Sequence, residues 1–223
     1  MADSNSQKEI SQEQVEGKAE EIVVEGTRVT ERVSALVLGA LQLAEDGLDR
    51  YAKIAESVVS GAVKGVERVV PDDAESTLRK VYNGLTDAGE KAAESLRLTF
   101  EEARERGKTF GEAEFDRTVE QLKNLEKELV DTVQGFTKRT SSEVSDQLEA
   151  VVRHAQRASS GMGASIQAAL DAAKDHPTGL IKESAQAGVD LSKNLAGGIL
   201  GAAAQFLDKA AKSLQTKGDE EEE

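Results

Sequence analysis

The sequence contains no cysteine and no tryptophan, and only two prolines and 3% aromatic residues among 223 positions. Without cysteine the chain can form neither a disulfide framework nor a thiolate site. With so few large apolar side chains a thick, self-contained core is hard to build, because burying an alanine contributes much less than burying a leucine or phenylalanine. The scarcity of proline, in contrast, permits very long helices.

Basic residues are also few, because the chain has 28 Lys and Arg but 42 Asp and Glu, which gives a net charge of −14. Nucleic-acid binding needs clustered Lys and Arg, so we expect no nucleic-acid partner. The same deficit disfavours electrostatic docking on anionic lipid. The first residues carry no basic start with an apolar run, and no apolar run reaches roughly 18 residues. We therefore expect a soluble cytoplasmic protein with no secretory signal and no transmembrane insertion.

What the sequence does contain is an apolar pattern that repeats every eleven residues. Between residues 10 and 70 one such row consists of Ile22, Val33, Ala44, Ala55 and Val66. Neighbouring rows are interrupted only at Gly26 and Gly47. Because a helix of about 3.6 residues per turn completes roughly three turns in eleven residues, each row points in one direction. The rows form an apolar stripe along a predicted helix of about 90 Å, with charged residues opposite.

These patterns predict an all-α protein of long amphipathic helices in an extended, bundled or coiled-coil arrangement. Pro71, Gly107 and Pro177 mark the expected breaks between helices. A polar residue, Thr140, stands within an eleven-residue row of the third helix. The expected organisation is a disordered start (1–10), a long amphipathic helix (11–70), a second helix (71–107), a third long helix (108–176), a fourth helix with an apolar patch (177–215) and an acidic disordered tail (216–223).

No motif predicts catalysis, a cofactor or a metal. Residues 107–109 read Gly-Lys-Thr, like the end of a phosphate loop, but Glu102 stands where that motif needs its first glycine, and a predicted helix precedes it instead of a strand. His154 and His176 are the only histidines, and there is no cysteine to join them in a metal site. The many carboxylates indicate solvated helix faces. We expect no enzyme activity.

The apolar stripe has two interpretations. The helices either pack against one another in a bundle or coiled coil, or lie along a hydrophobic polymer or lipid-like surface. Gly61 and Gly65 favour close helix packing within a bundle. The residues expected to bind an apolar surface are Ile22, Val33, Val37, Leu48, Val59, Val66, Leu122, Val133, Val144, Val151, Ile166, Leu195, Ile199, Leu200 and Phe206.

In its long, aromatic-poor helices, as in residues 47–70 and 113–158 and in the segment from Glu183 to Leu195, the chain resembles the phasins. These proteins coat polyhydroxyalkanoate granules. The resemblance implies an all-helical homo-oligomer without catalytic residues, whose stripes meet the polymer and whose charged faces meet the cytoplasm. Some phasins carry a basic tail that binds DNA, but this chain ends in acidic residues, so that property is not expected here.

Two further functions remain open. The first is a structural helical bundle or coiled coil that oligomerises without a surface partner. The second is a desiccation-type stress protein that is largely unfolded in water and becomes helical on drying. High helicity in dilute buffer, measured by circular dichroism, would exclude the stress protein.

Overall fold

The structure is a computed structural model that describes residues 11–42, 47–69, 73–107, 110–157 and 161–174. These residues form seven α-helices and one short 3-10 helix, η1, with no β-strand among them, which confirms the all-α fold. The elements are α1 (Gln12–Glu25), α2 (Val29–Gln42), η1 (Gly47–Arg50), α3 (Tyr51–Val69), α4 (Ala74–Glu105), α5 (Glu112–Thr137), α6 (Ser142–Arg157) and α7 (Gly161–Lys174).

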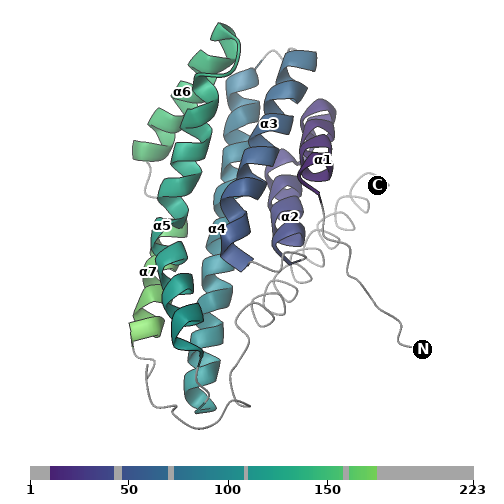
Figure 1. Cartoon of the computed structure of the whole chain (residues 1–223). Coiled ribbons are helices and arrows are strands. Elements are labelled where there is room, and N and C mark those ends of the chain that lie inside the picture. Colours follow the sequence, from purple (N-terminus) through teal and green to yellow (C-terminus); the bar gives the residue numbers. More distant parts are fainter. Residues whose placement is uncertain (1–10, 43–46, 70–72, 108–109, 158–160, 175–223) are drawn as a thin grey trace, which may run out of the picture.

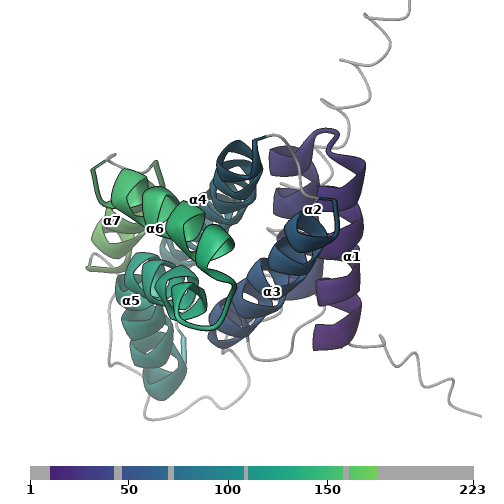
Figure 2. The ribbon, with the colours of Figure 1, turned by 90° about the horizontal axis from the view of Figure 1, so that it is seen from above.

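The long helix α4 is the axis of the described bundle (Figure 1). Its 32 residues span about 48 Å at 1.5 Å per residue. Helices α1, α2 and α3 lie to one side of α4, and α5, α6 and α7 lie to the other, as the view from above also shows (Figure 2). All eight apolar positions that step through α4 by threes and fours are buried, namely Leu78, Val81, Leu85, Ala88, Ala92, Leu96, Phe100 and Ala103.

Residues 11–70 do not form the single long helix that the sequence predicts. The chain leaves the first helix at Gly26, which adopts a left-handed conformation (φ +68°) and donates its N–H to the carbonyl of Ile22. Glycine adopts this conformation without a steric penalty and commonly ends helices. A second interruption separates α2 from α3 around Gly47, where η1 begins. Gly26 and Gly47 are the two residues that interrupt the apolar rows.

Residues 108–176 are likewise not one long helix. The described part contains α5, α6 and α7, and α5 ends at Thr137, shortly before the polar residue Thr140 of the eleven-residue row. The turn is held by the hydroxyl of Ser145, which donates to the carbonyl of Thr137 at 2.6 Å. The second helix, in contrast, is present as α4 close to its expected bounds. Its first turn is capped by Asp73, whose carboxylate accepts from the backbone N–H of Ser76 at 2.8 Å.

Glycines bring α1 and α3 into backbone contact. A Cβ atom added to Gly61 would lie 2.1 Å from the carbonyl oxygen of Glu16, and one added to Gly65 would lie 2.8 Å from the Cβ of Val23. Contact positions rise together along both helices, so α1 and α3 run in the same direction. The predicted role of the Gly61–Gly65 spacing in close packing within a bundle is confirmed.

We expect Gly61→Ala to destabilise the bundle by about 2–3 kcal/mol, because its methyl group overlaps the backbone of α1 and the two helices must move apart. For a chain of this size this corresponds to a decrease in Tm of about 5–10 °C. The measurement is thermal unfolding followed by circular dichroism.

Gly17→Ala is the matched control, because Gly17 is exposed on α1 and an added Cβ would meet nothing within 4 Å. Alanine there should stabilise the chain by up to about 1 kcal/mol through its higher helix propensity. Equal stability changes in the two variants would contradict the close contact between α1 and α3.

Two further helix pairs meet at glycines. A Cβ atom on Gly84 of α4 would lie 2.6 Å from the carbonyl oxygen of Thr30 in α2, and next to it Ser34 donates to Asp87. Farther along α4, a Cβ atom on Gly89 would lie 2.3 Å from the sulfur of Met162 in α7. Helix α4 therefore binds α2 on one side and α7 on the other through close contacts at two glycines.

Candidate apolar binding surface

The apolar stripe of the sequence lies inside the described bundle. Eleven of the fifteen residues predicted to bind an apolar surface are buried, with between 0 and 8% of their surface exposed: Ile22, Val33, Val37, Leu48, Val59, Val66, Leu122, Val133, Val144, Val151 and Ile166. The other four, Leu195, Ile199, Leu200 and Phe206, lie outside the described residues. In the described bundle the stripes of neighbouring helices cover one another and so leave water.

The core that results is built from small side chains. More than half of the buried hydrophobic residues in the described part are alanine or valine. Burial of an alanine contributes little, and close helix contacts at glycines replace the volume that larger side chains would fill. The core is therefore continuous but thin.

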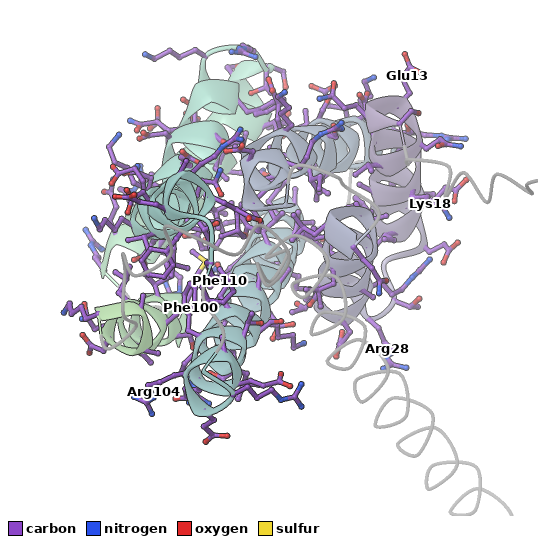
Figure 3. All side chains as sticks on the ribbon, turned by 60° about the horizontal axis from the view of Figure 1, so that its bottom comes forward. Glu13, Lys18, Arg28, Phe100, Arg104 and Phe110 are labelled. Atoms are coloured by element: carbon purple, nitrogen blue, oxygen red, sulfur yellow. The ribbon has the colours of Figure 1, made fainter. Side chains whose placement is uncertain are left out.

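Three phenylalanines pack together near the end of α4 and the start of α5. The rings of Phe100 and Phe115 lie 5.5 Å apart, those of Phe100 and Phe110 lie 5.7 Å apart, and both pairs meet edge to face. Such aromatic pairs add about 0.5–1.5 kcal/mol beyond the burial of their area. In Figure 3 Phe100 and the half-buried Phe110 lie toward the middle of the view, whereas Glu13, Lys18, Arg28 and Arg104 lie at its periphery.

The outer surface of the described bundle is strongly charged. Its large exposed hydrophobic residues are Val24, Val69 and Leu98, which come from three different helices. Ion pairs run along the outside of single helices, as between Arg97 and both Glu94 and Glu101 on α4. The described part thus presents a largely polar surface, and most of its apolar side chains face inward.

The residues that bear on catalysis or metal binding are dispersed. His154 is exposed on α6, and His176 lies outside the described residues. Over the ranges that the structure describes, no three His, Cys, Asp or Glu side chains gather as a metal site would require. Gly107 follows the helix α4, not the strand that a phosphate loop needs, while Lys108 and Thr109 lie outside the described residues.

Tyr51 is a fully buried side chain of α3 that carries a polar group, its phenolic hydroxyl. Its buried hydroxyl donates to the carbonyl of Leu85 at 2.6 Å and so joins α3 to α4. Burial, and secondarily the nearby Tyr82, raise the pKa of Tyr51 above its usual value of 10. The protonated hydroxyl is required in the folded bundle, because a buried phenolate would lose its hydration.

This raised pKa predicts a loss of stability in alkaline solution. The pKa of Tyr51 in the folded state exceeds that in the unfolded state, so ionisation favours unfolding as the pH rises above about 10. We expect Tyr51→Phe to weaken this alkaline loss while lowering stability at pH 7 by about 1 kcal/mol through the missing hydrogen bond. The measurement is chemical denaturation between pH 7 and 11. An identical alkaline slope in both proteins would contradict the assignment.

The described part is therefore an all-α bundle whose core consists of its own amphipathic stripes. Over residues 5–216 the sequence matches a family of unknown function, DUF6781, and the chain belongs to that family. No curated protein matches the chain, and no solved structure matches it.

The hydropathy of the described helices bears on membrane insertion. Within the ranges that the structure covers, none of them is both long enough and apolar enough to span a bilayer.

Proposed function

We propose that this protein is a non-enzymatic coat of an uncharged apolar surface, as in a phasin-like protein on an intracellular polyhydroxyalkanoate granule. The closed bundle is the form free in the cytoplasm, and opening the bundle turns its stripes towards the polymer. One observation carries the proposal: the core is made of stripes that belong to individual helices. Helices that separate from one another therefore remain amphipathic.

The composition of the core limits the free energy that opening the bundle requires. Because most buried hydrophobic residues are Ala or Val, the apolar area that each loses on opening is smaller than for a core of leucine and phenylalanine. An apolar surface replaces that contact along the full length of the helix, so adhesion grows with the number of stripe residues that reach it. The helical hydrogen bonds need not break, since they lie within each helix.

The net charge of the chain favours binding to an uncharged surface over binding to an anionic one. The net charge of −14 opposes adsorption to anionic phospholipid but does not oppose adsorption to a polyester. Coated granules would carry the same sign of charge and repel one another. The phasin resemblance also implies a homo-oligomer, which belongs to the same proposal.

The proposal is tested by mixing the whole chain with polyhydroxybutyrate particles in 0.5 M salt and measuring co-sedimentation. We expect saturable adsorption that high salt does not remove, with helicity retained on the particles. Anionic phospholipid vesicles serve as the comparison and should bind less protein. Absence of co-sedimentation with the polyester would overturn the proposal.

The second candidate is a structural bundle without a surface partner. It is favoured by the small number of large hydrophobic side chains that the described surface exposes. This candidate predicts a defined oligomer in light scattering and a cooperative unfolding transition. It also predicts that the protein does not adsorb to apolar particles. The particle assay therefore separates the two candidates directly.

A further inference from the structure

We refer to the boundary between α3 and the α5–α6 hairpin as the α3/α5–α6 seam. Two clefts lie along it. One, of about 320 Å³, lies between α3 and α5 and is lined by residues that include Ala52, Glu56 and Phe136. The other, of about 250 Å³, is lined by Val66, Val144 and Gln147, among others, where the end of α3 meets the start of α6.

At its one described glycine, α5 has no close contact with α3. Gly135 of α5 lines the larger cleft, and a Cβ atom added to it would meet nothing within 4 Å. In contrast, an added Cβ on Gly61, Gly84 or Gly89 would lie less than 3.0 Å from a neighbouring helix or its side chains. The contacts of α1 with α3, of α2 with α4 and of α7 with α4 are thus tight, whereas the seam is open at the two clefts.

Exposed ion pairs cross the seam, one of them between Arg117 of α5 and Asp49 just before α3. Arg139 pairs with Glu56 across it at 3.4 Å, and the two side chains are 66% and 55% exposed. Ion pairs as exposed as this contribute about 0–1 kcal/mol. Glu56 faces Glu128 and Asp131 across the larger cleft, so like charges line both walls. Partial burial, together with Asp49 and Asp131, raises the pKa of Glu128 above its usual value.

We propose that the bundle opens along the α3/α5–α6 seam, and that the faces covered there are the first to bind the uncharged apolar surface. The inference rests on the proposed function and specifies which interface produces it. Helix α1 stays on α3, and α2 and α7 stay on α4, because these contacts are close and lie at glycines. Opening exposes apolar side chains on both walls, including Val66 on α3, Phe136 on α5 and Val144 on α6.

The experiment uses reversible tethers, for which the absence of native cysteine is an advantage. The variant E56C/R139C carries a thiol on each wall of the seam, at the positions of the exposed ion pair. The variant E20C/R68C carries thiols on α1 and α3, at a second exposed ion pair with atoms 3.2 Å apart. A third variant, E149C/R153C, places both thiols on α6 and controls for the reagent. Each folded protein is linked with a short bis-methanethiosulfonate, which a reductant removes.

Adsorption to polyhydroxybutyrate particles is then measured before and after reduction. We expect the seam tether to slow adsorption at least tenfold and reduction to restore the original rate. The α1–α3 tether and the α6 tether should leave the rate within twofold of that of the unlinked proteins. The inference is overturned if the linked seam variant adsorbs at the unlinked rate, or if the α1–α3 tether blocks adsorption equally. Failure of the unlinked proteins to adsorb would instead overturn the proposed function itself.

Discussion

Replacing Val33 with lysine is expected to destabilise the bundle by about 4 kcal/mol or more, the range typical of an unpaired charge placed in a core. Val33 is a fully buried residue of α2. A Cβ atom added to Gly84 of α4 would lie 2.7 Å from the Cβ of Val33. A lysine there must either lose hydration or push α2 away from α4. The measurement is denaturant unfolding of the purified chain, followed by circular dichroism.

The matched control is Leu98→Lys, which introduces the same charge on α4 at a position that is 51% exposed. It should change stability by no more than about 0.5 kcal/mol, as is usual for surface substitutions. The two variants also distinguish a role of Val33 in the core from a role in binding the polymer. If Val33→Lys abolished adsorption to polyester particles but left the unfolding midpoint unchanged, Val33 would contact the polymer without being part of the core, which contradicts the bundle.

Truncation of Phe100 to alanine is expected to cost about 3–5 kcal/mol, because it removes a large side chain from a fully buried site and leaves a cavity. Phe100 also contacts the rings of both Phe110 and Phe115, so the turn from α4 to α5 loses its aromatic cluster. The corresponding decrease in Tm is about 6–20 °C for a chain of this size. Differential scanning calorimetry measures this decrease.

Phe136→Ala serves as the comparison, since Phe136 is only half-buried and lines the cleft between α3 and α5. It is expected to lose about 1–2 kcal/mol, because less of its area leaves water on folding. If the two variants were equally stable, the cluster at Phe100 would not be the principal aromatic contact of the bundle.

The positions of the helix breaks could have been predicted more closely from the same residues. Gly26 and Gly47 interrupt the apolar rows, and each stands next to a helix end in the structure. Thr140 interrupts a row between α5 and α6 in the same way. The eleven-residue spacing continues across these turns, so it predicts long helices. It does not indicate where the chain reverses its direction.

The sequence alone determined that the described chain is helical and which face of each helix is apolar, since both follow from the order of residues along one helix. It could not determine what the apolar faces lie against, because a stripe of Val and Ala is satisfied equally by a neighbouring helix or by a polymer. Only the tertiary structure decided that α1 lies on α3 and α2 on α4, through glycine contacts between residues about 50 positions apart. Such pairings depend on how closely two backbones can approach, and this property belongs to both helices together.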